Sequence, residues 1–548
     1  MSTTTMPTSV GSSEFSKLSP FELKDKLIEM ADESVKTRAA VMLNAGRGNP
    51  NWIATTPREA FGLMLAFGLA EARRSRDEPD VGLAGMPKSP GIAARFEEFL
   101  NSSPASPGAL LLRKSLHYGV EKLGFDPDKF VWELTDAVIG DNYPVPDRML
   151  VHTERIVQEY LAKEMCDGRP PKGKLDLFAV EGGTAAMAYI FHSLMVNKVL
   201  HRGDTIALGT PIFTPYLEIP HLKEYDFKVV SIEQSEMTDQ GRHAWQYPES
   251  EIKKLEDPRI KAFYLVNPSN PASTAVRQET IDQIVALVRS KRPDLLILTD
   301  DVYGTFVPGF RSLYAELPRN TILVYSYSKH FGCTGWRLGV VGIHEDNIID
   351  EKIAALPAND RDELNGRYGV LTLTPQDFKF IDRMVAESRV IALNHTAGLS
   401  LPQQLQMALF SLFALLDADD AYTKRCRKIC QDRLHALCQG LGLDLHEDPQ
   451  RTSYYTTLDV EAWAMKNVGA GFMDYVKSHR EPLDLVFALA QRHSTVLLNG
   501  SGFGGPPWSA RVSLANLDDA AYAQIGKNLA AVVKGAVEKW EKAGRPRG

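Results

Sequence analysis

Lys329 is the residue of this chain whose surroundings most clearly indicate covalent chemistry. It lies in the run SYSKHFGCTGWR, which extends from Ser326 to Arg337. A lysine amine condenses with an aldehyde to form an imine. A serine hydroxyl and an arginine fork can bind a phosphate group. The run therefore predicts an imine-forming lysine beside a phosphorylated cofactor, and the alternative is a surface loop with ordinary charges.

A glycine-rich turn supplies a second candidate contact to phosphate. In the run VEGGTAAM, Gly182, Gly183 and Thr184 follow a predicted strand and begin a predicted helix. The backbone N–H groups at the start of a helix, together with the threonine hydroxyl, can bind a phosphate. A simple turn would also explain the two glycines.

Polar residues also follow two of the predicted strands at their carboxyl ends. Asp300 ends the apolar run LLILTD, where a carboxylate without a cationic partner would be costly. A protonated pyridine nitrogen would supply that partner and keep the ring cationic, as an electron sink requires. Asn270, in NPSNPAS, and Tyr303, in LTDDVYGTF, could reach an oxygen on the same ring. The alternatives are a helix N-cap for the aspartate and a proline-rich turn around Asn270.

Alternating strands and helices between residues 174 and 341 would bring these residues together. Helical segments, for example 184–200 and 280–290, separate several β-rich runs. This alternation predicts an α/β fold with a largely parallel sheet, whose ligands bind at the carboxyl ends of the strands. The predicted strands are residues 175–180, 204–209, 227–232, 261–266, 295–300 and 321–326.

Outside this region the pattern is mainly helical. Helices are expected at about 21–43, 58–76 and 151–165, and one long helix at about 401–441 is followed by a smaller mixed domain. The stretch 77–140 is rich in Gly, Pro and Ser and has no regular pattern.

Composition excludes several classes of protein. The chain has 548 residues, of which 44% are hydrophobic and 24% charged, and its net charge is −7. No basic run indicates nucleic-acid binding, no apolar stretch is long enough to span a membrane, and residues 1–13 resemble a disordered tail more than a signal peptide. The five cysteines form no C-x-x-C pair and no His cluster accompanies them, so no metal site is predicted. Buried thiols in a reducing cytoplasm are expected.

The order of the motifs resembles that of pyridoxal-phosphate enzymes with the class I aminotransferase fold. This order is GGT, NP-x-NP, D-x-x-Y, S-x-S-K and an arginine eight residues after the lysine. The resemblance implies fold type I, with a mostly parallel central sheet in a large domain and a smaller α+β domain. It implies pyridoxal 5′-phosphate as cofactor and Lys329 as its Schiff-base lysine. Asp300 would pair with the pyridine nitrogen, and Asn270 and Tyr303 would lie at the phenolic oxygen.

The same resemblance assigns further residues. Gly183, Thr184, Ser326 and Arg337 would surround the phosphate. Three other positions also match the family: Phe213 would stack on the ring, Arg511 would bind the substrate α-carboxylate, and Tyr143 would reach the phosphate of a neighbouring subunit. A homodimer with shared active sites is therefore the smallest assembly that the resemblance implies.

The chain also departs from ordinary members of this fold. It is longer, with the excess near 75–140 and 351–390. We therefore expect an N-terminal arm with part of the small domain at 1–60, a large domain at 61–425 and a small domain at 426–548. Arg47 replaces a small or apolar residue in AGRGNPNW. No arginine for a distal carboxylate is evident near 394–400, where His395 is the nearest candidate.

These departures resemble bacterial aspartate 4-decarboxylases within the family. The resemblance implies β-decarboxylation of L-aspartate to L-alanine and CO₂ through a ketimine and an enamine, with side aminotransferase activity, in a dodecamer. A tight salt bridge to the β-carboxylate would oppose CO₂ loss, so a weaker group suits this reaction. Arg47 would orient the substrate or support proton delivery, unless it is only a structural loop arginine paired with a carboxylate. Asn270 and His395 would also bind the substrate.

Two other functions would use the same fold. An aspartate aminotransferase is the nearest alternative, because it uses the same early intermediates. A cofactor-sensing transcriptional regulator would need an N-terminal DNA-binding module, and the N-terminal arm is too short and not basic.

Overall fold

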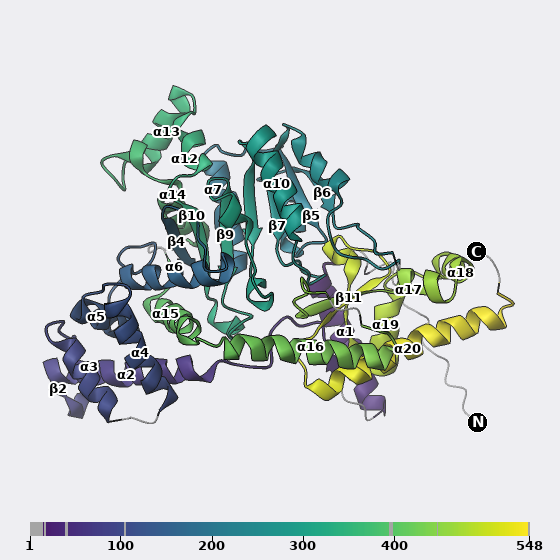
Figure 1. Cartoon of the computed structure of the whole chain (residues 1–548), viewed down its shortest axis with the longest axis horizontal. Coiled ribbons are helices and arrows are strands. Elements are labelled where there is room, and N and C mark those ends of the chain that lie inside the picture. Colours follow the sequence, from purple (N-terminus) through teal and green to yellow (C-terminus); the bar gives the residue numbers. More distant parts are fainter. Residues whose placement is uncertain are drawn as a thin grey trace.

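A seven-stranded sheet forms the centre of the protein in this computed structural model, which describes residues 15, 18–38, 42–102, 106–239, 241–393, 398–445 and 448–545. The strand order is β4-β10-β9-β8-β7-β5-β6 (Figure 1). β10 is antiparallel to both of its neighbours, and all other neighbouring strands are parallel. The strands are β4 (Leu175–Val180), β5 (Thr205–Thr210), β6 (Lys228–Glu233), β7 (Ile260–Val266), β8 (Leu296–Asp300), β9 (Thr321–Ser326) and β10 (Gly339–His344).

The strands predicted from the sequence are confirmed, each to within one residue at either end. β10 was not predicted, because two glycines interrupt its apolar run and weaken the strand pattern. One of them, Gly339, is required by packing: a Cβ there would lie 2.6 Å from the Cα of Gly182. The missing side chain at Gly339 makes room for the glycine turn after β4.

Both faces of the sheet are buried, as the continuous apolar runs require. Phe178 and Val180 of β4 pack on one face against helices that include α7 and α14. Leu177 and Ala179 pack on the other face against α6. The helices around the sheet are α6 (Val151–Met165), α7 (Gly183–Val196), α8 (Pro215–Glu218), α9 (Glu249–Ile252), α10 (Gln278–Lys291), α11 (Leu313–Glu316), α12 (Ile348–Ala354), α13 (Ala358–Tyr368) and α14 (Phe380–Ala392).

The stretch that lacked a regular pattern forms a helical subdomain beside the sheet (Figure 1). Our expectation of irregular structure was wrong here, because the Ser, Asp and Pro residues begin helices. Ser106 and Asp126 accept hydrogen bonds from backbone N–H groups three residues on, and a proline follows each of them. The subdomain has its own apolar core. It comprises α2 (Thr55–Ser75), β2 (Asp77–Glu78), β3 (Leu83–Ala84), α3 (Ile92–Asn101), α4 (Pro107–Glu121), α5 (Pro127–Ile139) and α15 (Leu401–Leu416).

The long C-terminal helix predicted at 401–441 is interrupted. It consists of α15 and α16 (Ala421–Leu441), separated by an acidic turn. Asp420 has a left-handed backbone with φ of 50°, and its carboxylate accepts from Lys163 Nζ at 2.7 Å. Asp417 accepts from the N–H of Tyr422 at 2.9 Å. The side chains of these two aspartates make hydrogen bonds that compete with the backbone pattern of a helix. Therefore α15 ends before the turn and α16 begins after it.

The C-terminal region packs around a small antiparallel sheet with the order β11-β14-β13. A short parallel pair, β1 with β12, joins the N-terminal segment to this region. Leu23 and Leu27 of α1 pack in the same apolar core as β14 and α20. The elements are α1 (Pro20–Arg38), β1 (Leu43–Asn44), β11 (Tyr455–Asp459), α17 (Val460–Asn467), α18 (Ala470–His479), α19 (Asp484–His493), β12 (Thr495–Val496), β13 (Leu498–Asn499), β14 (Ser509–Ser513) and α20 (Asp519–Lys542).

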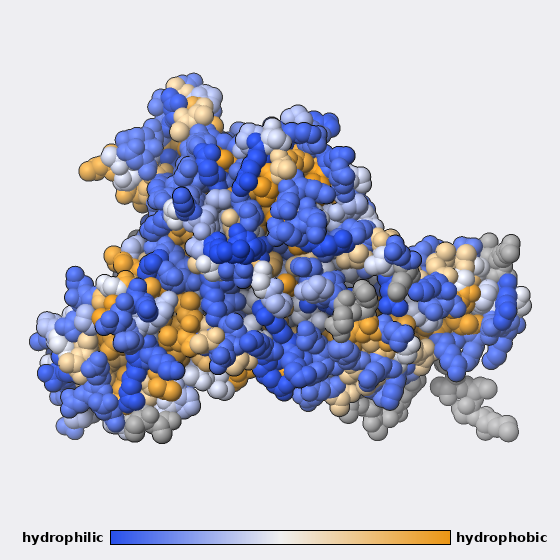
Figure 2. Space-filling view, in the orientation of Figure 1, coloured by the Kyte–Doolittle hydropathy of each residue, from blue (hydrophilic) through white to orange (hydrophobic). Residues whose placement is uncertain are grey.

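The surface in Figure 2 is mainly hydrophilic, with apolar side chains gathered over the α2–α5 subdomain. All five cysteines are buried free thiols, as predicted. In the part of the chain that the structure describes, no helix is long and apolar enough to cross a membrane.

Candidate active site

Asp300 and Lys329 follow neighbouring parallel strands, β8 and β9, at the same edge of the sheet. Asp300 is buried, with 7% of its surface exposed. Its Oδ2 accepts from the Tyr216 hydroxyl and its Oδ1 from the N–H of Val302, both at 3.3 Å. Burial raises the pKa of Asp300 to about 6, against a smaller opposing effect of the Lys329 cation. Asp300 forms no ion pair with any described residue, so it can accept a cationic partner.

Lys329 contacts a loop from the far N-terminal part of the chain. Its Nζ donates to the carbonyl oxygen of Gly48 at 3.2 Å. The hydroxyl of Tyr454 donates to the same oxygen at 2.8 Å. Gly48 therefore fixes the end of the lysine side chain through its backbone.

The loop around Gly48 and the segment after Lys329 are interlocked. Trp52 Nε1 donates to the carbonyl of His330 at 3.2 Å, and Arg58 donates to Gly332 at 2.7 Å. Gly332 has a φ of +61°, and a Cβ there would lie 1.9 Å from the carbonyl oxygen of Trp52. Only glycine suits this position, for both its backbone conformation and the space available.

The glycine turn and Arg337 meet after β4. Gly182 caps the start of α7 with a φ of +88°, and a Cβ on it would lie 2.7 Å from Arg337 Nη2. Arg337 is exposed and donates to the carbonyls of Glu181 and Thr334, both at 3.1 Å. The helix start, with Gly183 at its first position, and a guanidinium thus lie together, as an anion site requires.

Other residues predicted around the cofactor lie near these strand ends. Thr184 is exposed in the first turn of α7. Ser326 ends β9, and its hydroxyl bonds Ser328 Oγ at 3.0 Å and the carbonyl of Leu338 at 3.2 Å. Phe213 follows β5, is half-buried, and meets the ring of Phe21 edge-on at 6.0 Å.

Arg511 lies on β14 and is almost fully buried, with 2% of its surface exposed. Its Nη1 donates to Asn270 Oδ1 at 3.1 Å and its Nη2 to the carbonyl of Gly46 at 2.9 Å. Its Nε is buried and has no partner among the described residues. Burial lowers the pKa of Arg511. A buried cation with an unused donor can bind a carboxylate.

Two predicted residues form no hydrogen bond or ion pair with these groups in the described chain, and a third lies outside it. Tyr143 is 73% exposed on a surface loop of the single chain. Arg47 is exposed beside Gly48 and forms no hydrogen bond or ion pair with any described residue. His395 lies outside the described residues.

Sequence motifs missed two tyrosines that the structure places here. Tyr454 contacts Gly48, and Tyr455 accepts a hydrogen bond from the Tyr303 hydroxyl at 3.0 Å. The only signal was an aromatic pair at the start of a β-rich run, RTSYYTTLDV. That pair alone does not distinguish a site from an apolar core.

Asp301 is a second buried carboxyl next to Asp300. Its Oδ1 accepts from Thr299 Oγ1 at 2.5 Å, and its Oδ2 is buried without a partner among the described residues. Burial raises its pKa to about 8. The two neighbouring carboxyls therefore have different charges near neutral pH.

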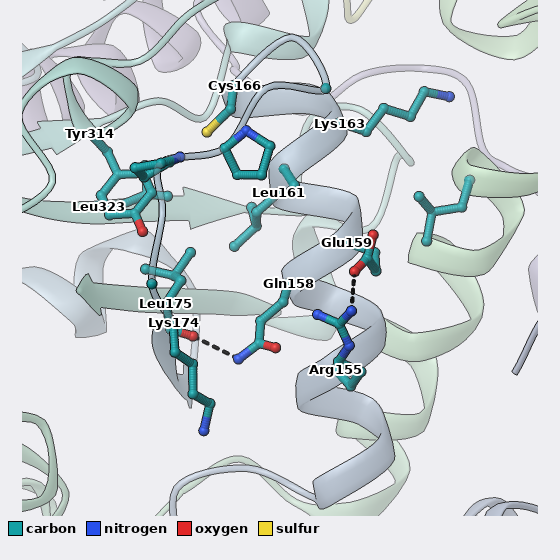
Figure 3. A pocket seen from close by; sticks show the side chains of 16 residues that line it. Arg155, Gln158, Glu159, Leu161, Lys163, Cys166, Lys174, Leu175, Tyr314 and Leu323 are labelled. Carbon is teal, nitrogen blue, oxygen red and sulfur yellow. Dashed lines mark hydrogen bonds and ion pairs between the residues drawn. The ribbon is translucent and has the colours of Figure 1, made fainter. Parts of the chain in front are cut away.

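A separate cavity of about 570 Å³ lies along α6 and the amino end of β4 (Figure 3). Gln158 donates to the carbonyl of Leu175 at 2.7 Å, and Arg155 pairs with Glu159 at 2.6 Å. These polar side chains already have hydrogen-bond or ion-pair partners within the protein. Lys329 instead follows the carboxyl end of β9, so this cavity is not the predicted site.

These residues could hold a cofactor at the carboxyl ends of the parallel strands. The uncompensated carboxylate of Asp300, the Lys329 amine and the helix start beside Arg337 fit a cationic ring, an aldehyde and a phosphate. Pyridoxal 5′-phosphate has all three groups, and the residues present fit it.

Comparison with known proteins identifies the family. Residues 178–528 match the family model described as aminotransferase class I and II. The chain is 47% identical over 528 residues to the bifunctional aspartate aminotransferase and L-aspartate beta-decarboxylase of a Pseudomonas species, covering 96% of this chain and 98% of that protein. The chain therefore belongs to the class I and II aminotransferases, a pyridoxal-phosphate-dependent family.

More distant relatives agree on the fold. An aspartate aminotransferase of Sulfolobus acidocaldarius is 28% identical over 181 residues, which cover 32% of this chain and 42% of that protein. The solved structure of the Rhizobium meliloti aspartate aminotransferase has a TM-score of 0.56 at 16% identity and covers 97% of this chain and 99% of that chain. The predicted fold, with its mostly parallel central sheet, is thereby confirmed.

Proposed function

We propose that the protein converts L-aspartate to L-alanine and CO₂ and also transaminates aspartate. The observation that carries this proposal is the 47% identity to a bifunctional enzyme along 96% of the chain. That similarity includes helices α2 to α5 and the N-terminal loop, which lie outside residues 178–528.

Arg511 and Asn270 are proposed to bind the α-carboxylate of aspartate. The hydrogen bond between them holds the guanidinium in one orientation before substrate arrives. Because Arg511 is buried, its attraction for a carboxylate is weakly screened by solvent. The free Nε–H supplies a donor that no described residue uses.

Lys329 is proposed to move the proton at the substrate Cα. When bound, pyridoxal phosphate withdraws electrons from the carbons attached to the substrate amine. Asp300 would keep this withdrawal strong by holding a negative charge at the pyridine nitrogen. Gly48 would keep the lysine amine on one side of the reacting carbon, through the contact at 3.2 Å.

We further propose that Arg47 orients the β-carboxylate without holding it in a buried salt bridge. Arg47 is exposed beside Gly48, so its charge is screened. A solvated contact stabilises the β-carboxylate of the bound substrate less than a buried bidentate arginine would. Such a contact therefore raises the barrier to CO₂ loss less. His395 remains a predicted second contact.

Product analysis tests the function directly. The enzyme is incubated with L-aspartate and pyridoxal phosphate, without a keto acid, and alanine and CO₂ are measured over many turnovers. Equal amounts of both support the decarboxylase. Turnover that requires 2-oxoglutarate, forms glutamate and releases no CO₂ would identify an aspartate aminotransferase instead.

We also propose a homodimer as the smallest active unit, a dodecamer as the full assembly, and a cytoplasmic location. The exposed Tyr143 supports the dimer, because an aromatic side chain at the surface is available to a neighbouring subunit. The five buried free thiols support a reducing compartment. Sedimentation velocity of the holoenzyme and cell fractionation test the assembly and the location.

A further inference from the structure

Tyr455 lies in the candidate site without a role in the proposed function above. It is buried, with 1% of its surface exposed, at the start of β11. In the register of β11 with β14, Tyr455 pairs with Ser513 and Thr457 pairs with Arg511. Tyr455 and Arg511 therefore project from the same face of the small sheet as diagonal neighbours. The guanidinium carbon of Arg511 lies 4.4 Å from the centre of the Tyr455 ring.

The hydroxyl of Tyr455 and the amine of Lys329 border the same small space. A Cβ on Gly48 would lie 2.6 Å from Tyr455 Oη and 3.4 Å from Lys329 Nζ. The two polar groups thus face each other across a glycine. A substrate whose α-carboxylate is bound by Arg511 and whose Cα is beside Lys329 would place its Cβ next to this space.

The proton of the Tyr455 hydroxyl has no acceptor among the described residues. Its oxygen accepts from the Tyr303 hydroxyl at 3.0 Å, and no described residue accepts from it. Tyr454 differs, since its hydroxyl donates to the carbonyl of Gly48. Of these two adjacent tyrosines, Tyr455 is the one whose hydroxyl proton no described residue accepts.

We propose that Tyr455 is the catalytic acid that protonates Cβ as CO₂ leaves, an inference that rests on the proposed decarboxylation. The bond between Cβ and the side-chain carboxyl carbon breaks, and its electron pair remains with the carbon skeleton. The O–H bond of Tyr455 then breaks and a C–H bond forms at Cβ. The phenolate regains a proton from water. While it exists, the Arg511 cation beside the ring stabilises its charge.

In this assignment, two different residues carry out the two proton transfers of the reaction. Lys329 works at Cα, which every reaction of the family requires. Tyr455 works at Cβ, which only decarboxylation requires. A change at Tyr455 should therefore alter the two kinds of reaction unequally.

The test compares Tyr455→Phe with Tyr454→Phe and the unmodified holoenzyme. Two rates are measured: alanine formation from L-aspartate, and exchange of the Cα hydrogen of L-alanine in D₂O followed by NMR. Y455F should slow alanine formation at least about 100-fold, the usual contribution of a general acid, and keep Cα exchange within about threefold. Y454F should lower both rates together, because its hydroxyl acts through Gly48 on Lys329.

A readout independent of turnover accompanies these rates. The cofactor should remain bound in Y455F, because the residues proposed to hold its phosphate are unaltered, and its absorbance reports the loss of the acceptor for the Tyr303 hydroxyl. The proposal is overturned if Y455F lowers both rates by the same factor, or if alanine formation stays within about threefold of the unmodified enzyme, as protonation by Lys329 would give. Failure of the unmodified enzyme to form alanine and CO₂ would instead overturn the proposed function.

Discussion

Arg511 donates a hydrogen bond to the side-chain oxygen of Asn270 at 3.1 Å, and this contact joins the small sheet to the loop after β7. The two residues are 241 positions apart in the chain. Asn270, which is predicted to contact the cofactor, therefore also orients Arg511, which is predicted to bind the substrate.

Replacing Arg511 with Lys should weaken aspartate binding while keeping the positive charge. Lysine cannot reproduce the planar fork that bonds Asn270 and Gly46. A hydrogen bond to a charged group contributes about 1.5–3 kcal/mol, so KM for aspartate should rise about 10- to 100-fold. Steady-state kinetics measure this. An unchanged KM would exclude Arg511 from substrate binding.

Replacing Gly48 with Ala should reduce activity without unfolding the protein. The added methyl group would lie 2.6 Å from Tyr455 Oη and 3.4 Å from Lys329 Nζ, so the site must shift. Gly62 is the matched control, because it lies within α2 and a Cβ there meets nothing within 4 Å. Gly62→Ala should keep activity and stabilise the protein by about 0.5–1 kcal/mol. Equal activity in the two variants would contradict the packing around Gly48.

Replacing Arg47 with Ala should lower the ratio of decarboxylation to transamination. The exposed side chain has no structural partner among the described residues, so the melting temperature should change little. We expect the ratio to fall about fivefold, because the orienting contact to the β-carboxylate is lost and a screened charge contributes on the order of 1 kcal/mol. Alanine and glutamate are quantified with 2-oxoglutarate present, and Arg47→Lys is the control. If R47A leaves the ratio unchanged, Arg47 has no direct role.

Stability should depend on pH through Asp301. Burial raises the pKa of this carboxyl to about 8, well above its value in an unfolded chain. The folded state thus favours the protonated form, and stability is lost as pH rises from about 4 towards 8. Asp301→Asn cannot ionise, so it should gain stability relative to the natural residue on the order of 2–4 kcal/mol between pH 5 and pH 9. Melting curves across this range check the gain; a constant difference would show that Asp301 stays charged.

Mixing two inactive variants should restore activity if subunits share sites. Tyr143→Ala would remove the group proposed to reach the partner, and Lys329→Ala the amine of the same site. A mixed dimer holds one site with both residues intact, so refolded mixtures should recover about one quarter of full activity. Each variant refolded alone is the control. No recovery, with mixed dimers shown to form, would place Tyr143 outside a shared site.

The sequence predicted six of the seven strands of the central sheet, because their apolar runs are typical of a buried sheet, whereas two glycines interrupt the run of β10. It predicted the helical subdomain poorly, since the residues that start those helices resemble loop residues. The candidate site divides in the same way. Lys329 and Asp300 could be predicted, because each lies at the end of a predicted strand and within a short motif that resembles the family. Tyr455 acquires its position from the pairing of β11 with β14 and from a loop more than 400 residues away, which no local pattern encodes.

The pairing of β1 with β12 has a consequence for synthesis of the chain. Leu43 and Asn44 have no strand partner until Thr495 and Val496 have been made. Gly48 lies just beyond β1, so its contact with Lys329 depends on a segment that is made more than 400 residues later. Nascent or truncated chains that stop before this segment can complete the central sheet and still lack a working lysine. Activity should therefore appear only after residues 495–513 have emerged from the ribosome.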